Sequence, residues 1–229
     1  MARLSVDERR RALVDAAIQV MTRDGVAKAT TRAVVTEAGM QLGFFHYCFS
    51  SKEELLAVVV ETITERNVAA AMSSVGPRRP VADMLREGMR AYWRGVEDDP
   101  ATHQLTYELT QYALRRPRLD AVARRQYAAY LQATTRFLNA AAAAADVTWT
   151  VPVPVLARQA AVVLDGATLS WLVDRDTAAT LAVLDQAAAA IAANARPASA
   201  AERAGNEPAV RADTSSDNAA SVSRSPEPS

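Results

Sequence analysis

The stretch that decides the fold lies at residues 42–56 and reads LGFFHYCFSSKEELL. Its first eight residues are rich in aromatic side chains and are too few to form a stable isolated helix, so they must pack against other parts of the chain. Residues 50–54 then offer overlapping capping boxes, in which a serine caps a helix and a glutamate three residues later reaches back. The stretch predicts a short aromatic helix followed at once by a longer one.

Two more helices are predicted before this stretch. A capping box at Ser5 and Glu8, followed by apolar residues at helical spacing, predicts a first helix over about 6–24. A second, short helix is predicted over about 31–38, because threonines stand at its start and Gly39 stands where a left-handed cap is wanted. Two short helices joined by a tight turn are typical of a helix-turn-helix, whose second helix enters the major groove of DNA.

The rest of the chain also predicts helices. Alanine is abundant and has the highest intrinsic helix propensity, and the prolines stand near helix starts and ends. Prolines within 146–154 remove backbone donors, so a loop is expected there, and no strand is expected anywhere. The fold class is therefore all-α, with about nine helices. The expected helices after the reading helix cover about 51–74, 80–98, 101–115, 118–145, 155–173 and 177–195.

Three regions follow from this pattern. Residues 1–52 form the predicted three-helix DNA-binding domain, and the helix at about 51–74 links it to a second helical domain over 53–196. From residue 197 onward the composition turns to Ala, Ser, Glu, Asn and Pro, with almost no large apolar residue. Such a segment buries too little surface to offset the entropy of ordering it, so we expect residues 197–229 to be disordered.

The composition excludes several classes of protein. The chain has 229 residues with one cysteine and two histidines, which leaves no internal disulfide framework and disfavours thiolate or histidine metal sites. Its apolar runs are shorter than the roughly 20 residues that a membrane helix needs, and the N-terminal residues lack the apolar core of a signal peptide. We expect a cytoplasmic protein with no metal, no cofactor and no membrane partner.

The net charge of zero conceals a division along the chain. Residues 1–52 hold eight basic and five acidic side chains, whereas residues 197–229 hold three basic and five acidic ones. A modestly basic first domain is attracted weakly to any DNA and leaves selectivity to a few placed contacts. This balance favours a sequence-specific regulator over a nonspecific DNA-compacting protein, which needs many more cations.

The predicted reading helix and the starts of its neighbours supply candidate DNA contacts. A glutamine can bond an adenine edge, Phe44 could contact a thymine methyl group, and the helix that starts at Thr31 offers free backbone N–H groups to a phosphate. Lys52 gains nothing from the dipole of the helix that it starts, so a phosphate is its better partner. Phe45 and Phe49 are expected to pack on the neighbouring helices. The predicted DNA-binding residues are Thr31, Arg32, Gln41, Leu42, Gly43, Phe44, His46, Tyr47 and Lys52.

These motifs resemble the TetR family of bacterial transcription regulators. The resemblance covers about residues 8–60 and rests on Thr31-Arg32-x-Val34, on Glu37-Ala38-Gly39 and on the run from Gly43 to Leu56. The order His46-Tyr47 is similar to the BetI-like subgroup, as are the stretches 107–117 and 165–172. The chain departs from the family at Phe44, where many relatives carry Thr or Ser, and at Cys48, where His is common.

The resemblance implies a homodimeric repressor of a palindromic double-stranded operator, released by a small-molecule effector. It implies that the last two helices of two subunits form a four-helix bundle, and that ligand in the second domain moves the helix at 51–74. In the last helix, leucines and small residues recur on one narrow stripe, which predicts a dimer seam. The predicted interface residues are Leu169, Leu172, Leu181, Leu184, Ala188 and Ile191.

Aromatic and methionine side chains of the second domain are the candidate ligand contacts, although the same spacing is typical of an ordinary core. Tyr107 and Trp171 are the preferred pair, because each needs a polar partner when it is buried. The predicted ligand-binding residues are Met89, Trp93, His103, Tyr107, Tyr127 and Trp171.

The competing functions are a helical-bundle enzyme and a small-molecule-binding protein with no DNA role. The sequence has no Glu-x-x-His pair, no nucleophile and base pattern and no Gly-rich phosphate loop. We therefore expect no catalytic residues and no enzymatic activity.

Overall fold

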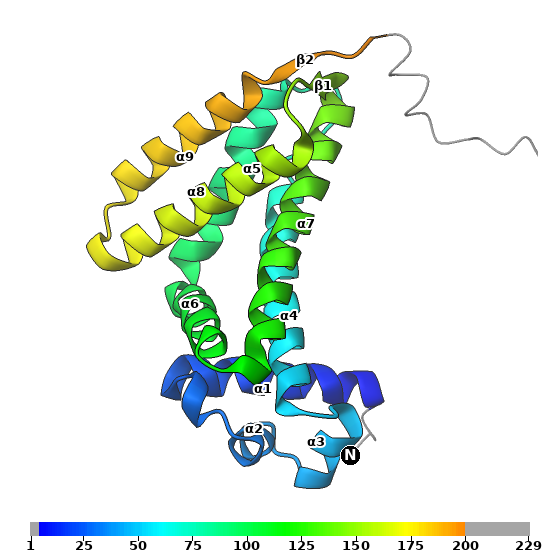
Figure 1. Cartoon of the computed structure of the whole chain (residues 1–229), viewed down its shortest axis with the longest axis vertical. Coiled ribbons are helices and arrows are strands. Elements are labelled where there is room, and N and C mark those ends of the chain that lie inside the picture. Colours follow the sequence, from blue (N-terminus) through cyan, green and yellow to red (C-terminus); the bar gives the residue numbers. More distant parts are fainter. Residues whose placement is uncertain (1–4, 200–229) are drawn as a thin grey trace, which may run out of the picture. The chain divides into compact units, whose positions relative to one another are not determined.

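The computed structural model describes residues 5–199, and every structural statement below concerns these residues. Within them lie nine α-helices and one two-stranded sheet, so the predicted helical fold is confirmed, with an N-terminal helix-turn-helix and a C-terminal helical part (Figure 1). The helices are α1 (Val6–Asp24), α2 (Thr31–Glu37), α3 (Leu42–Cys48), α4 (Lys52–Met72), α5 (Val81–Asp98), α6 (Pro100–Leu114), α7 (Asp120–Ala145), α8 (Val153–Asp174) and α9 (Thr177–Ala192). Short 3₁₀ turns, η1 (Val26–Lys28) and η2 (Pro117–Leu119), precede α2 and α7.

The predicted caps of α1 and α2 are confirmed. The Ser5 hydroxyl accepts the backbone N–H of Glu8, and the Glu8 carboxylate accepts the backbone N–H of Ser5 at 2.7 Å. Thr30 caps α2, where its hydroxyl accepts the backbone N–H of Ala33. Gly39 follows α2 with φ of 62°, a left-handed conformation that glycine adopts without a steric penalty.

The start of α4 shows which of the overlapping capping boxes forms. Ser51 is the N-cap, and its hydroxyl accepts the N–H of Glu54 at 3.1 Å. The Glu54 carboxylate reaches one residue further back, to the backbone N–H and the hydroxyl of Ser50, at 2.8 and 2.7 Å. These bonds turn the chain sharply between α3 and α4.

Two clusters of buried apolar residues hold the helices together. The first cluster joins α1, α2, α3 and the first half of α4 to Leu105 and Leu109 of α6 and to Val122 of α7. The second cluster joins α5, α7, α8 and α9. Between the clusters, α4 runs beside α7 (Figure 1). The domain boundary predicted at residue 52 stays a prediction, because the first cluster contains residues from both sides of it.

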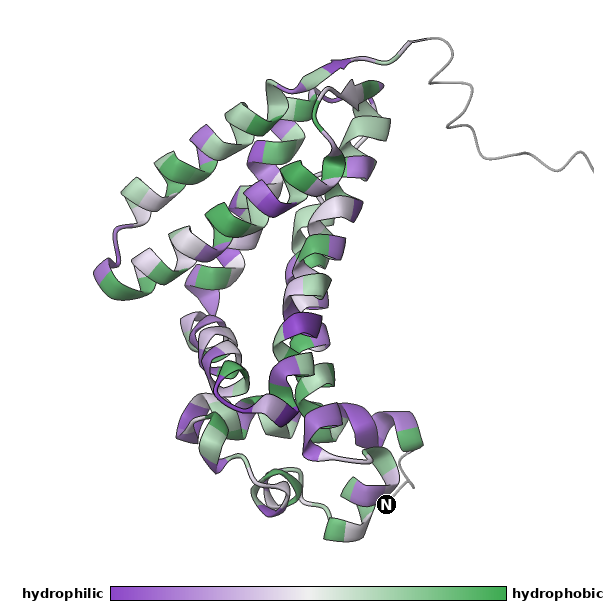
Figure 2. Cartoon of the chain, viewed as in Figure 1, coloured by the Kyte–Doolittle hydropathy of each residue, from purple (hydrophilic) through white to green (hydrophobic). Residues whose placement is uncertain are grey.

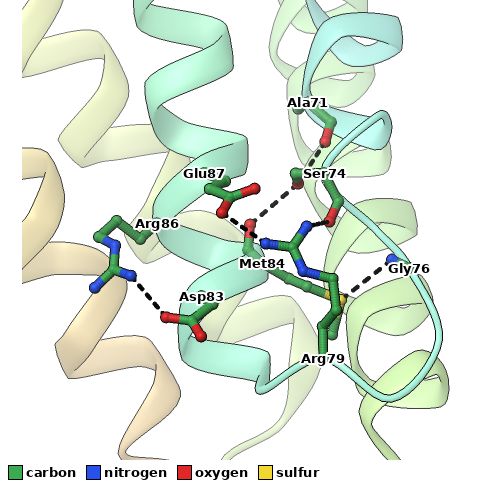
Figure 3. A network of polar contacts seen from close by, with 8 residues as sticks. All are labelled: Ala71, Ser74, Gly76, Arg79, Asp83, Met84, Arg86 and Glu87. Carbon is green, nitrogen blue, oxygen red and sulfur yellow. Dashed lines mark hydrogen bonds and ion pairs between the residues drawn. The ribbon is translucent and has the colours of Figure 1, made fainter.

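A polar network secures the connection from α4 to α5 (Figure 3). The Ser74 hydroxyl donates to the carbonyl of Met84 at 3.1 Å, and Arg79 donates to the Ser74 carbonyl at 2.9 Å. Arg79 also pairs with Glu87 of α5 at 2.6 Å. The end of α4 is thereby tied to the first two turns of α5.

The expectation of no strand was wrong. Within the interval expected to be a loop, β1 (Val147–Trp149) pairs antiparallel with β2 (Ala195–Pro197), with Val147 opposite Pro197. β-Branched and aromatic residues favour extended backbone, and α9 ends three residues earlier than predicted, which frees the partner segment. Proline is tolerated in such a two-stranded edge pairing.

Two further expectations concern the end of the chain and membranes. The tail predicted to be disordered falls almost entirely on residues 200–229, which lie outside the described residues. Among the helices of residues 5–199, none is long and apolar enough to cross a membrane.

Candidate nucleic-acid interface and ligand cavity

Helix α3 has one buried face and one exposed face. Phe45 is 1% exposed and lies with the buried Cys48 and Phe49 in the first core cluster, so the predicted packing role of Phe45 and Phe49 is confirmed. Tyr47 is 67% exposed. The predicted contacts on this helix and its N-cap all lie at the surface, namely Gln41, Leu42, Gly43, Phe44, His46 and Tyr47.

Two arginines of α1 hold α3 in position. The Arg10 guanidinium donates to the carbonyl of Cys48 at the end of α3 and to Glu54 at 2.8 Å, and it lies 4.3 Å from the centre of the Phe49 ring. The Arg9 guanidinium lies 4.8 Å from the centre of the Phe44 ring. Part of the basic charge of the first domain therefore positions the exposed helix and does not project freely toward a partner.

The Glu54 carboxylate is strongly stabilised in its charged form. Hydrogen bonds from the Ser50 backbone and hydroxyl, and then from Arg10, lower the pKa of Glu54 to about 2. The carboxylate therefore remains ionised at neutral pH and joins the ends of α3 and α4 to α1.

The candidate phosphate contacts lie in different surroundings. Arg32 is exposed in the first turn of α2, and Thr31 is half-buried beside it. The Nζ atom of Lys52 lies 5.6 Å from the centre of the Tyr112 ring of α6. Burial, and then the nearby charge of Arg116, lower the pKa of Lys52. Lys52 thus packs against α6, and its phosphate contact stays a prediction.

A cavity of about 110 Å³ lies within the C-terminal helices. This is much more room than a single water molecule occupies. Helices α4 to α8 supply most of the walls, and Ile191 of α9 closes one side. The residues at the cavity that bear aromatic rings or charge are Tyr92, His103, Tyr107, Tyr130, Phe137 and Asp165.

Tyrosine hydroxyls position Asp165 at the wall of this cavity. The Tyr127 hydroxyl donates to Oδ2 of Asp165 at 2.8 Å, and the Tyr107 hydroxyl donates to the Asp165 backbone carbonyl at 2.8 Å. Burial raises the pKa of Asp165 above its ordinary value, and the Tyr127 bond partly opposes that rise. Burial also lowers the pKa of His103, so this imidazole is neutral at pH 7.

The cavity contains only part of the predicted ligand set. Met89, His103 and Tyr107 line it, so their contact with a ligand stays a prediction. Trp93 and Trp171 do not line it, so this cavity gives no support to their ligand role, which stays a prediction. Their rings pack edge to face at 5.1 Å in the second core cluster, and the Trp171 indole N–H donates to the Thr177 hydroxyl at 3.0 Å.

Tyr127 occupies a position between these cases. It is 40% exposed and is not part of the cavity wall, but its hydroxyl holds Asp165. Asp165 itself was missed as a site residue. The signal was present, because it is the one charged residue between Gln159 and Val173 of α8.

The predicted dimer seam needs correction. Leu184, Ala188 and Ile191 are at most 1% exposed within a single chain, because that face of α9 packs into the second core cluster. Those three residues are therefore unavailable to a second subunit. Leu169 is 50% exposed, while Leu172 and Leu181 are half-buried against the second core cluster. The large apolar side chains that α8 and α9 leave exposed are Val155, Val162, Leu169, Val173 and Val183.

Comparisons with known proteins agree with this architecture. Residues 13–59 match the model of the bacterial regulatory proteins of the tetR family. The chain is 29% identical over 172 residues to the nicotine-responsive transcriptional repressor HdnoR of Paenarthrobacter nicotinovorans, which covers 75% of this chain and 88% of that protein. It is 33% identical over 87 residues to the transcriptional regulator BetI of Rhizobium meliloti, which covers 36% of this chain and 43% of that protein.

Similarity to a solved structure extends over both helical regions. The multidrug binding protein EbrR, solved in complex with imidazole, is 30% identical to this chain with a TM-score of 0.58. The match covers 79% of this chain and 94% of that chain. The likeness therefore includes the cavity-bearing helices as well as α1 to α4.

Proposed function

The chain belongs to the TetR family of bacterial regulatory proteins, and from this premise we propose that it is a homodimeric repressor released from a palindromic operator by a small molecule. The observation that carries the proposal is the two-sided α3. Its inner face is anchored by Phe45, while Tyr47 keeps 67% of its surface exposed. A seven-residue helix that buries one aromatic face and displays another is suited to reading a groove.

The proposed DNA contacts divide by their role. Gln41 and Phe44 lie on the exposed side of α3 and its N-cap, where they can meet base edges and thymine methyl groups. Tyr47, Thr31 and Arg32 are suited to phosphate contacts, which fix orientation without reading sequence. The Arg9 guanidinium over the Phe44 ring limits how that ring turns.

The proposed dimer uses the outer faces of α8 and α9. Val162 and Val173 are 61% and 83% exposed, and Leu169 lies between them along α8. On α9, Val183 is 51% exposed with exposed alanines on the same side. These exposed apolar side chains on α8 and α9 support the use of these two faces as the interaction surface. A palindrome requires the two copies of α3 to lie about 34 Å apart, one turn of DNA.

Helix α6 offers a route from the cavity to the DNA-binding helices. Tyr107 lines the cavity, and the next residue, Glu108, accepts the backbone N–H of Val26 at 2.7 Å. Val26 begins η1, the turn between α1 and α2, after Gly25 with φ of 88°. A ligand that displaces Tyr107 would move Glu108 and so shift the DNA-binding helices. If the ligand binds this shifted state more tightly than the DNA-bound state, it lowers the affinity for DNA by the same factor.

The relatives support a response to small molecules. HdnoR is nicotine-responsive and EbrR is a multidrug binding protein, and both match this chain over the cavity helices.

Footprinting of the promoters beside the native gene tests the DNA-binding proposal. We expect a protected palindrome, and we expect Tyr47→Ala to weaken binding roughly tenfold or more at every sequence, as loss of a phosphate contact does. Tyr47→Phe should weaken binding as well, because it keeps the ring and removes the hydroxyl that would donate to the phosphate. The absence of any protected site in the neighbouring promoters would overturn the proposal.

The route through α6 is tested with the same footprint. Candidate metabolites suggested by the neighbouring genes are added until one releases the wild-type protein. Glu108→Ala should then bind the operator but resist release, whereas Gln104→Ala, an exposed position on the same helix, should release normally. Equal release of both variants would show that α6 signals by another contact.

A further inference from the structure

We propose that the cavity binds a small organic cation, an amine whose charge lies beside Asp165 and whose apolar body lies among the aromatic side chains. This inference rests on the proposed function in one respect, since such a cation would be the effector. The binding step itself can be measured without DNA.

The charge at the cavity wall favours a cation. Asp165 is the one charged side chain among the lining residues, and none of them is a lysine or an arginine. Among residues 5–199, no basic side chain forms an ion pair with Asp165. Asp165 is partly buried, and partial burial of an ionised carboxylate without a counter-charge carries a cost that a bound cation would reduce.

The hydrogen bonds at Asp165 leave one oxygen available. The Tyr127 hydroxyl occupies Oδ2, and no hydrogen bond to Oδ1 is found in the part of the chain that the structure describes. The Tyr107 hydroxyl donates to the backbone carbonyl of the same residue, which steadies the backbone of α8 at this point. The carboxylate is therefore positioned in advance to accept an ammonium N–H group.

Tyrosine rings line the same cavity as this carboxylate. Tyr92, Tyr107 and Tyr130 all line the cavity, and a cation within about 6 Å of such a ring face is attracted to it. Burial, supplemented by the charge of Asp165, raises the pKa of Tyr92 and of Tyr107, so both phenols stay protonated at neutral pH. The Tyr92 ring is also fixed edge to face against His103 at 5.6 Å.

The rest of the wall is apolar and suits an uncharged ring or chain. Leu85, Met89, Phe137 and Leu138 form this part, and Gly88 lets α5 approach the Phe137 ring closely. The volume of about 110 Å³ accommodates a compact molecule and not a long chain. An anion would be repelled by Asp165, and a neutral molecule would leave its charge unpaired.

Calorimetry on the full-length protein at pH 7.5, with no DNA present, tests the inference directly. The probes are N-benzylmethylamine, which is protonated, benzyl methyl ether, its neutral counterpart of similar size, and phenylacetate, an anion. We expect the amine to bind roughly tenfold or more tightly than the ether, as a paired charge and a cation–π contact imply, and phenylacetate not to bind. Equal affinity for amine and ether, or binding of phenylacetate, would overturn the inference.

Substitution then assigns the preference to one side chain. Asp165→Asn should lose roughly tenfold in amine affinity while the affinity for the ether stays within about twofold. Asp174→Asn, on the same helix but outside the cavity, should behave as the wild type. Tyr127→Phe keeps the charge of Asp165 and should keep the preference for the amine. It is the variant to measure if Asp165→Asn does not fold. Loss of amine preference in the Asp174 variant, or its retention in a folded Asp165→Asn protein, contradicts the assignment.

The two proposals fail in different ways. A protected operator with no amine preference would overturn this inference and leave the repressor proposal standing. An amine preference with no protected operator would overturn the repressor proposal and leave the cation site standing.

Discussion

The reading head, defined as residues 5–54, and the cavity differ in the range of the contacts that build them. The side-chain caps that begin the helices of the head, at Ser5, Thr30 and Ser51, join residues three apart. The bonds that position Asp165 at the cavity join residues far apart in the chain, such as Tyr107 to Asp165, 58 positions away. Local contacts leave a pattern in the sequence, whereas distant contacts do not.

Each region also holds one side chain whose position folding alone does not explain, and the two side chains differ in their exposure. The head leaves Tyr47 in water, although an exposed aromatic contributes little to stability. The cavity does the opposite, since it partly buries Asp165 without a basic partner among residues 5–199. In both regions the anomalous side chain marks the place where a partner would improve the energy.

The largest expected effect separates the two faces of α3. Phe45→Ala should lower the free energy of unfolding by about 3–5 kcal/mol, since it empties a fully buried site, and should abolish operator binding. Phe44→Ala, its exposed neighbour, should cost less than about 1 kcal/mol. Urea unfolding followed by circular dichroism measures both. Similar costs for the two variants would show that α3 is not anchored on one face.

The next effect tests the tight packing of the body. A Cβ at Gly88 would lie 2.3 Å from Cζ of Phe137, so Gly88→Ala should cost about 1–3 kcal/mol through overpacking and reduce the cavity. Gly95→Ala, on the same helix and with 3.9 Å to its nearest atom, should stabilise by up to about 1 kcal/mol. Thermal unfolding ranks the variants. Operator binding should survive in both, because α3 is anchored elsewhere.

The smallest effect contrasts the two carboxyl groups by pH. The pKa of Glu54 is lowered to about 2, so its contribution is complete above about pH 4.5 and is lost as the pH falls toward 2. The pKa of Asp165 is raised, so its ionised form weakens the fold at neutral pH and protonation relieves this on acidification. Glu54→Gln should therefore reduce the loss of unfolding free energy on acidification. The reduction should be less than about 1 kcal/mol, because the pair of Glu54 with Arg10 is partly solvated.

The Asp165→Asn variant should change the pH dependence of stability in the opposite direction. This variant should be more stable than the wild type at neutral pH, and the difference should shrink on acidification below the pKa of Asp165. Unfolding midpoints measured between pH 3 and pH 8 reveal both trends. Parallel curves for the two variants would contradict the contrast between head and cavity.

The sequence was more informative about the head than about the body. It predicted the bounds of α1 and α2 to within a residue, the left-handed Gly39 and the burial of Phe45 and Phe49, because each depends on neighbours within a turn or on one amphipathic helix. In the body it predicted helices but placed Trp93 and Trp171 at the ligand, whereas the structure places both in the second core cluster and off the cavity wall. Burial is the same in a core and in a pocket wall, and only the packing of whole helices tells the two apart.

The error at the dimer seam has a similar cause. Figure 2 colours most of α9 as apolar, and its composition offers apolar residues on both sides. Periodicity then identifies a stripe but not the surface that covers it. The structure places Leu184 and Ile191 in the second core cluster of the same chain and leaves Val183 exposed.

By itself, the sequence determined the helical fold, the family, and the caps and turns of the reading head, since these depend on propensity and on contacts within a few residues. The tertiary structure alone decided three things: the strand pairing that ends α9, the face of α9 that stays exposed, and the meeting of Asp165 with the tyrosines of α5, α6 and α7. Each of these joins segments that are distant in the chain. Their approach depends on how whole helices pack, and that is a property no local stretch of residues carries.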